Sequence, residues 1–512
     1  MNFYLTPTTN EEVIKLIKNL NPRKKGGADN VSPKLVQNNA SFLLDKIVHI
    51  ANISFLSGEF PEQLKLAKVI PIFKKNEDYL TSNYRPISLL STISKIIEKL
   101  VHKRLIGFLE KHNLLYAHQF GFRHNHSTTL ALIELVDNLQ NEMAKGHYVG
   151  GIYMDLSKAF DTVDHNILIS KLEHYGIRGH PLNWFRSYLH KRQQYTEINS
   201  YKSSTSYITH GVPQGSVLGP LLFLIYTNDL VNSIDPDSKL RLFADDANVF
   251  ITKSNPHDLK KYMQTVVSNM SSWFKSNKLS LNMGKTCFSI FTNSKKEIPV
   301  YLNSLQINGE NIKRVKYAKY LGVILDDRLK WEDHINALCN SLIKITNSFK
   351  IIKHYVPESN KLLLFNAYFA SKVQYGIEVF GRANSTLIQK LQTKQNRALK
   401  VLYNLNIMTN TNSIHKRFNV LKIHDVYKLN LLKFVYKQQN KMLPNIFSQY
   451  FQKNNEFHTH NTRQSKGLHI DKHEKTTHYE GAKLWNSVPK DVQSLKFKSF
   501  SKNVKTLFLK DY

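Results

Sequence analysis

The stretch RLFADDANVF, from Arg241 to Phe250, places two adjacent aspartates in the middle of an otherwise apolar segment. Two apolar arms around a short break predict a β-hairpin, for which Asp-Asp is a poor two-residue turn compared with Asn-Gly. Adjacent carboxylates also repel each other, and burying one without a partner costs free energy or shifts its pKa. A local rule broken at one place in a chain indicates a functional site. The fold must therefore provide a group that offsets this repulsion.

A divalent cation is the group that fits best. Mg²⁺ prefers hard oxygen ligands and accepts one or two carboxylates together with water and substrate phosphate. A third carboxylate comes from Asp155, near the end of the apolar run HYVGGIYMDL, a pattern typical of a buried strand. Two metal ions bridged by such carboxylates are a general arrangement for in-line phosphoryl transfer. The alternative is that Asp245 and Asp246 form a solvated turn.

The composition indicates a folded, strongly basic protein. The 512 residues are 41% hydrophobic and 11% aromatic, which allows a sizeable core and roughly two to four domains. The net charge of +32 predicts a polyanionic partner, because Lys and Arg neutralise phosphates and release counterions; the alternative is a merely basic protein. We find no uninterrupted apolar run of membrane-spanning length and no secretory signal at Met1, so we expect no membrane partner. Cys287 and Cys339 predict free thiols in a reducing compartment.

From about Leu329 helical patterns dominate, and the last quarter of the chain is strongly basic. Residues 382–512 contain 24 Lys or Arg against 7 Asp or Glu, and no acidic residue lies between Glu378 and Asp425. One predicted helix there has an apolar face, with Leu391, Ala398, Leu402 and Leu405, and a basic face, with Lys390, Lys394 and Arg397. We interpret the basic face as a nucleic-acid-binding stripe that tracks phosphates; the alternative is a solvated helix face.

Seven short motifs follow one another along the chain: NYRPISLLSTISKIIEKL, QFGFRHNHSTTLAL, YMDLSKAFDTVDH, GVPQGSVLGPLLF, LFADDANVF, LNMGKTCF and YLGVILDD. Each motif alone is weak, but the ordered series is very specific. It closely resembles the reverse transcriptase domain of non-LTR retrotransposons, most like the jockey-type lineage, over roughly residues 15–330.

The resemblance implies roles for individual residues. Asp155, Asp245 and Asp246 match the catalytic, metal-binding aspartates of this family. Phe160 matches the bulky residue whose ring clashes with a ribose 2′-hydroxyl, with a core aromatic as the alternative. Lys285 matches a lysine that protonates the leaving pyrophosphate, with a solvated surface lysine as the alternative.

The resemblance also implies residues that bind the nucleotide. Gln214 matches a residue that lines the incoming-nucleotide pocket, and Gly215 would let the backbone approach the nucleotide closely. Arg85, Lys95 and Arg123 are cations of the predicted fingers. We expect at least one of them to grip the triphosphate, since a planar guanidinium suits phosphate, and each has a purely structural alternative.

The expected fold is α+β, a right-hand polymerase. Its parts are an amino-terminal extension with fingers, a palm built on an antiparallel sheet, a helical thumb, and a basic, mostly helical carboxy-terminal region. The expected boundaries are, in that order, residues 1–146, 147–328, 329–405 and 406–512, with the reverse transcriptase domain at about 55–328.

The implied function is that of a nucleotidyltransferase, the RNA-directed DNA polymerase of a non-LTR retrotransposon. Element RNA would be the template, a DNA 3′-hydroxyl at a primer or target would be extended, and dNTPs would be the substrates. The cofactors would be two Mg²⁺ ions, with Mn²⁺ as a substitute. We expect the protein to be unsecreted, in the nucleus and cytoplasm.

Two departures from the family pattern bear on this expectation. The early loop RKKGGADN keeps Asp29 but lacks the usual prolines, which predicts a looser loop. Full-length elements of this lineage carry an endonuclease before the polymerase, and this chain starts at Met1 without room for one. We therefore expect a truncated copy of the element, or an endonuclease supplied by another chain.

Three other interpretations are open. A viral RNA replicase would more often show Gly-Asp-Asp and select ribonucleotides, which FADD and Phe160 argue against. A group II intron maturase would need an intron-binding domain, and no segment resembles one. An inactive or domesticated RNA-binding protein derived from such an element would also be basic, but nothing would keep all three aspartates in place.

Overall fold

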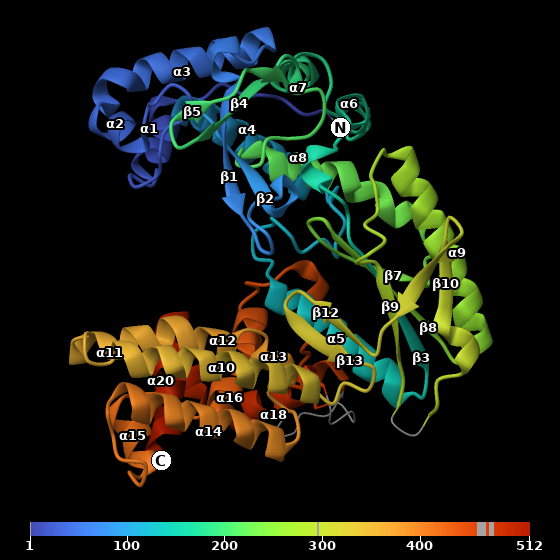
Figure 1. Cartoon of the computed structure of the whole chain (residues 1–512), viewed down its shortest axis with the longest axis vertical. Helices are drawn as coiled ribbons and strands as arrows, with labels where there is room; N and C mark the ends of the chain where they lie inside the picture. The colour runs from blue at the N-terminus through green and yellow to red at the C-terminus, as the bar shows by residue number, and fades with distance from the viewer. Residues whose placement is uncertain (1, 294–295, 458–466, 471–475) are drawn as a thin grey trace.

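The computed structural model describes residues 2–293, 296–457, 467–470 and 476–512. Two pieces of the predicted basic region, residues 458–466 and 471–475, lie outside the described residues. The chain forms three successive parts arranged in an arc (Figure 1): amino-terminal helices with a small sheet, a larger sheet with its helices, and a carboxy-terminal body of helices.

The larger sheet has six strands. Their order is β10 (Ser304–Ile307), β11 (Glu310–Arg314), β9 (Cys287–Phe291), β3 (Tyr148–Met154), β8 (Asp246–Lys253) and β7 (Lys239–Phe243). Strand β3 is central and antiparallel to both β8 and β9. All seven residues of β3 are buried, as expected for a strand covered on both faces.

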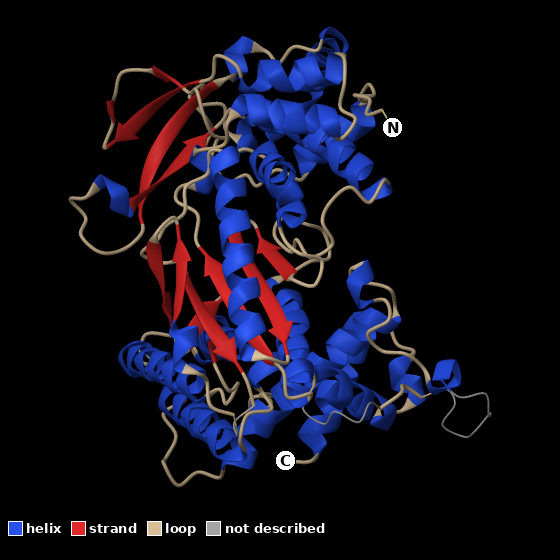
Figure 2. Ribbon diagram, turned by 90° about the vertical axis from the view of Figure 1, so that its right-hand side faces the viewer, coloured by secondary structure: helices blue, strands red, loops and turns tan. Residues whose placement is uncertain are grey.

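Helices cover both faces of this sheet, and Figure 2 shows one long helix lying across the strands. Helix α9 (Pro256–Ser276) packs on β3 and β8, and α5 (Thr128–Ala144) packs on β3. Alternate residues of β3 enter two separate apolar clusters, Ile152 with α9 and Val149 with α5. Gly150 permits the close approach of α9, because a Cβ there would lie 2.3 Å from the sulfur of Met263.

The predicted acidic hairpin is present, but its turn is shifted by one residue. Strands β7 and β8 pair with Phe243 opposite Asp246, so the two turn residues are Ala244 and Asp245. Ala244 has a positive φ of 56°. The expectation of an Asp245–Asp246 turn is wrong, because the pairing with β7 extends β8 as far as Asp246.

The amino-terminal part contains the second sheet. Its path is β2 (Tyr84–Leu89), β1 (Leu66–Phe73), β4 (Gln193–Ile198) and β5 (Tyr201–Lys202), with β6 (Ser206–Tyr207) paired to β4. The helices of this part are α1 (Asn10–Lys18), α2 (Pro33–Asn38), α3 (Ala40–Ser57), α4 (Thr92–Lys111), α6 (His165–His174), α7 (His180–Leu189) and α8 (Leu218–Thr227).

Helix α3 is long and apolar enough to cross a membrane by length and composition, a weak criterion that core helices also meet. Asp45 and Lys46 interrupt its apolar run, so it is not an uninterrupted run of membrane-spanning length. The helix packs against α1 and α7, while Phe42, Ile53 and Leu56 on its outer side are exposed. The absence of a membrane partner stays a prediction.

Helices dominate from Glu332 onward, as predicted, after the two-stranded sheet of β12 (Tyr317–Tyr320) and β13 (Val323–Asp326). They are α10 (Glu332–Ile352), α11 (Glu358–Leu364), α12 (Ser371–Gln374), α13 (Ile377–Phe380), α14 (Ser385–Leu402), α15 (Thr411–Arg417), α16 (Ile423–Gln439), α17 (Asn454–Phe457), α18 (Thr477–Ser487), α19 (Lys490–Gln493) and α20 (Phe497–Lys510). A π-helical segment, Phe365–Ala370, joins α11 to α12. All of these helices except α17 contribute to one apolar cluster with α5, so they pack against the central part of the chain.

Candidate active site

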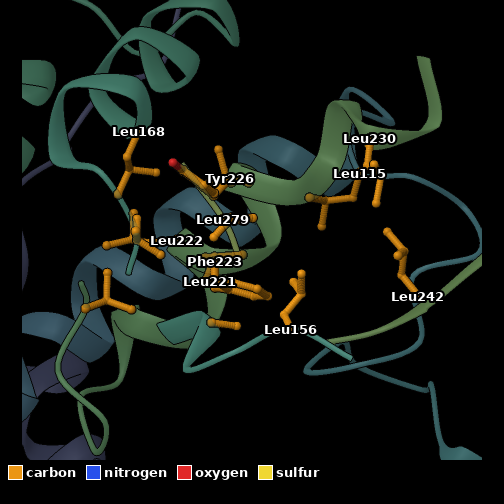
Figure 3. Packing of buried hydrophobic residues seen from close by; sticks show 14 of the residues in the cluster. Leu115, Leu156, Leu168, Leu221, Leu222, Phe223, Tyr226, Leu230, Leu242 and Leu279 are labelled. Carbon is orange, nitrogen blue, oxygen red and sulfur yellow. The ribbon is translucent and has the colours of Figure 1, made fainter. Parts of the chain in front are cut away.

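The chain on either side of the aspartates is anchored in one apolar cluster. Leu156 follows Asp155 directly, and Leu242 lies three residues before Asp245. Figure 3 shows both leucines in the packed cluster that contains Phe223 of α8. A close-packed interior resists displacement, so the cluster holds the backbone beneath the carboxylates in place.

The three aspartates come together through strand pairing. Asp155 is the first residue after β3, Asp245 lies in the hairpin turn, and Asp246 begins β8. Met154 pairs with Ala247, so Asp155 and Asp246 occupy the next facing positions of the two strands. Facing positions of an antiparallel pair have neighbouring side chains. The prediction that Asp155 joins the acidic hairpin therefore agrees with the register.

Burial and mutual repulsion raise the pKa of both hairpin carboxyls. Burial is the largest cause for Asp246, followed by the charges of Asp245 and Asp155, and together they raise its pKa to about 6. The pKa of Asp245 is raised first by burial and then by Asp155, while Arg85 and Lys285 act in the opposite direction. The three carboxylates are thus close enough to repel one another.

Lys285 lies against this group. Its Nζ donates a 2.6 Å hydrogen bond to Oδ2 of Asp155. Within the described ranges, no three His, Cys, Asp or Glu side chains form a ready-made metal-binding group. The donor chemistry nevertheless fits a hard divalent cation, because the three carboxylates supply hard oxygen ligands. Of these three carboxylates, Asp155 is the one that pairs with a lysine among the described residues.

Phe160 lies in the 3₁₀ turn Ala159–Asp161 that follows Asp155. Its ring centroid is 4.6 Å from that of Phe223, with 31° between the ring planes. It also meets the ring of Phe122 edge-on, at 6.1 Å. Because Phe223 is fully buried, the Phe160 ring rests on a fixed base.

The loop that contains Gln214 joins Phe160's turn to the small sheet. Nε2 of Gln214 donates to both carboxylate oxygens of Asp161, at 2.9 and 3.0 Å. The backbone carbonyl of Gln214 accepts a 2.7 Å hydrogen bond from the backbone amide of Ser88 in β2. Gly215 has a φ of 129°, and a Cβ there would lie 2.4 Å from the Ser88 carbonyl oxygen, so only glycine fits. Since the carboxylate accepts, Gln214 must turn its nitrogen toward Asp161 and its oxygen away.

Arg85 and Lys95, two of the three predicted finger cations, differ in whether their charge acts on the aspartates. Arg85, exposed on β2, is near enough to Asp245 to lower its pKa. Lys95 on α4 has its pKa lowered by burial, an effect that Glu98 opposes. Of the three predicted finger cations, Arg85 is thus the one that acts on the aspartates, together with Lys285.

Arg123 is turned toward the protein. Its Nη1 donates to the carbonyl of Tyr116 at 2.9 Å and to that of Gln119 at 3.5 Å. Burial lowers the pKa of its guanidinium. These contacts favour the structural alternative for Arg123.

Three residues that support the site were missed in the sequence. Asp161 orients Gln214, Gln119 is buried beside the hairpin turn, and Glu98 is a fully buried acceptor for the amides that begin α8. A signal existed for Glu98, which is a single acid on the apolar face of a predicted helix. Asp161 and Gln119 lie within recognised motifs, but no local pattern indicates their partners.

The predicted basic stripe lies on α14, in the helical body rather than at the aspartates (Figure 1). Lys390 and Arg397 are exposed and Lys394 is half-buried. On the opposite face Leu391 and Ala398 are fully buried, as the helical spacing predicted.

Residues 72–325 match the family described as reverse transcriptase (RNA-dependent DNA polymerase). The chain contains a reverse transcriptase domain. All three aspartates, Phe160 and Lys285 lie in the reverse transcriptase domain, whereas the stripe on α14 lies beyond it.

Similar proteins extend the likeness beyond the reverse transcriptase domain. The chain is 28% identical over 444 residues to the probable RNA-directed DNA polymerase from transposon BS of Drosophila melanogaster, covering 83% of this chain and 48% of that protein. It is 29% identical over 429 residues to the RNA-directed DNA polymerase from mobile element jockey of Drosophila funebris, covering 82% and 46%. The chain therefore spans about half the length of the curated relatives it matches.

Proposed function

We propose that the chain is the RNA-directed DNA polymerase of a non-LTR retrotransposon, which copies element RNA from a DNA 3′-hydroxyl. The observation that carries this proposal is the convergence of Asp155 with Asp245 and Asp246 at paired strand ends of a reverse transcriptase domain. The relatives named as RNA-directed DNA polymerases support it.

The parts of the fold take polymerase roles in this proposal. Residues 1–146 are the fingers with their extension, although β4 to β6 and α6 to α8 join this part from later in the chain and α5 packs on the larger sheet. The six-stranded sheet, residues 147–328, is the palm. Residues 329–405 are the thumb, and residues 406–512 add a basic region that contacts nucleic acid.

The carboxylates of Asp155, Asp245 and Asp246 would hold Mg²⁺. Two such ions, when bound, activate the primer hydroxyl and stabilise the leaving pyrophosphate. The aspartates hold their oxygens at one end of the sheet, where the charge of a bound divalent cation would offset their mutual repulsion. Lys285 keeps a proton on Nζ beside Asp155, where it can be given to the leaving group.

Selection of the nucleotide rests on Phe160 and its neighbours. The ring stands on Phe223, so it cannot sink to make room for a 2′-hydroxyl. Gln214 donates its side-chain nitrogen to Asp161, which leaves its side-chain oxygen free to accept a hydrogen bond from a nucleotide. Arg85 supplies the positive charge for the triphosphate.

Primer extension on an RNA template, with a DNA primer, dNTPs and Mg²⁺, tests the proposal. The parent chain should extend the primer, while Asp155→Ala and Asp245→Ala should lose roughly a hundredfold or more, because each removes a metal ligand. Template binding should remain, because the Lys and Arg side chains that bind phosphate are unchanged. The exposed Asp237→Ala is the matched control and should extend normally. Extension by either active-site variant at the parental rate would contradict the metal assignment, and a parent that only binds RNA would indicate the domesticated alternative.

A further inference from the structure

Phe122 combines two features that are costly in a folded protein. Its φ is 56°, in the left-handed region that bulky side chains rarely adopt. Its side chain is also 56% exposed. Among the described residues the other aromatic with a positive φ is Trp331, which is 2% exposed, so burial offsets its strain. No such burial compensates Phe122, and strained residues of this kind cluster at functional sites.

The turn that presents Phe122 is tied to the catalytic hairpin. Gln119 is 2% exposed, and its Oε1 accepts hydrogen bonds from the amides of Gly121 at 2.9 Å and Ala244 at 3.1 Å. A Cβ on Gly121 would lie 2.4 Å from the Ala244 nitrogen, so the two backbones touch. The amide of Phe120 donates to the Leu242 carbonyl at 2.8 Å. Gly121 precedes Phe122 and Ala244 precedes Asp245, so this contact fixes the turn of Phe122 against the hairpin that carries Asp245.

The ring of Phe122 is the group that this turn offers to the site. It meets Phe160 edge-on, with 87° between the planes and 6.1 Å between centroids. The neighbouring Arg123 points inward, to the carbonyls of Tyr116 and Gln119. The turn therefore leaves an exposed apolar ring, and not the Arg123 cation, beside the proposed sugar gate.

We propose that Phe122 is a substrate-contacting residue whose ring packs on the apolar face of a deoxynucleoside at the polymerising end. The inference rests on the proposed function. The deoxynucleoside is either that of the incoming dNTP or that of the last base pair of the template–primer duplex. Alanine substitution at a base–aromatic contact weakens binding by roughly five- to a hundredfold, so the contact is measurable.

The strain itself provides the test. Phe122→Gly relieves the positive φ, so the thermal unfolding midpoint should stay at or above that of the parent. The same variant should raise either the dNTP KM or the Kd for template–primer about fivefold or more, because the ring is removed. A higher KM at saturating template–primer assigns the ring to the incoming nucleotide, and a higher Kd without dNTP assigns it to the duplex end. Phe122→Tyr keeps the ring and should retain most of the dNTP and template–primer affinity that Phe122→Gly loses.

Other outcomes overturn the inference. If Phe122→Gly lowers the unfolding midpoint and leaves both binding measurements unchanged, the ring is a packing support for Phe160. If only ribonucleotide incorporation rises, Phe122 positions the gate without touching substrate. If the parent extends primers and both variants match it, the inference fails while the proposed function stands. A parent that extends no primer overturns the proposed function and this inference with it.

Discussion

At the scale of single residues, the ring of Phe160 is confined by Phe223 below and Phe122 at its side. Phe160→Ala should open the space that a 2′-hydroxyl needs and lower the preference for dNTPs over rNTPs by roughly tenfold or more. Phe160→Tyr keeps the ring and should keep the preference. Primer extension with each nucleotide set alone measures it. Unchanged ribonucleotide exclusion in the alanine variant would show that Phe160 only packs.

Glu378 on α13 makes stability depend on pH. Burial raises the pKa of its carboxyl to about 7, and the smaller effects of Lys433 and Lys437 do not cancel this. Between about pH 4.5 and 7 the unfolded chain loses this proton while the folded chain keeps it. The free energy of unfolding should therefore fall across that interval, by about 3 kcal/mol in total, and stay low above it.

Glu378→Gln removes the titrating group. The variant should be more stable than the parent at pH 8 and similar to it at pH 5, because the parental carboxyl is then mostly neutral in the fold. Urea unfolding at both pH values measures the difference. Glu173→Gln, at an exposed position on α6, is the control and should not alter the pH profile. An equal offset between parent and Glu378→Gln at both pH values would argue against the linkage.

At the scale of secondary-structure elements, α14 separates an apolar face from a basic one. Replacing Lys390, Lys394 and Arg397 by glutamine should leave the helix folded, because the opposite face stays buried. Removing one phosphate-binding cation lowers the salt slope of log K by about 0.7–0.9, so the triple variant should flatten it by roughly two units, similarly across unrelated RNAs.

Binding titrations at several salt concentrations measure this slope. Glutamine at Lys261 and Lys275, exposed on α9 behind the larger sheet, is the control and should leave the slope unchanged. The same slope in parent and triple variant would mean that the stripe is a solvated face. Loss of binding to one RNA alone would indicate specific recognition instead.

Elements were predicted well where their pattern is local. The buried strand before Asp155, the acidic hairpin and the helical end of the chain all follow from apolar spacing. The hairpin turn was misplaced by one residue because its register depends on pairing with β7. No local pattern reports which residue of a partner strand lies opposite.

At the scale of the whole molecule, Asp137 joins the reverse transcriptase domain to the end of the chain. Its buried carboxylate on α5 accepts hydrogen bonds from the amides of Thr477 at 2.9 Å and His478 at 3.2 Å. It also accepts from the Tyr450 hydroxyl and pairs with Arg382 at 3.1 Å. Segments after residue 440 are thereby tied to α5, which packs on the larger sheet.

Asp137→Asn should loosen this junction. Removing one charge of a buried ion pair typically costs about 3–5 kcal/mol, so the unfolding midpoint should drop and residues 440–512 should become sensitive to limited proteolysis. Asp511→Asn, at an exposed position, is the control and should behave as the parent. Parental stability and proteolysis in Asp137→Asn would show that the apolar packing alone holds the two parts together.

The ordered motifs indicated the family by resemblance, and with it the three aspartates, while apolar spacing and composition indicated the basic helical end; each of these signals is written locally in the chain. Only the tertiary structure shows which distant residues contact one another. Lys285 reaches Asp155 across 130 positions, and Asp137 meets Thr477 across 340. The inward turn of Arg123 and the strained exposure of Phe122 likewise depend on what packs around them. Such contacts arise from the packing of distant segments, for which no short stretch of sequence contains the information.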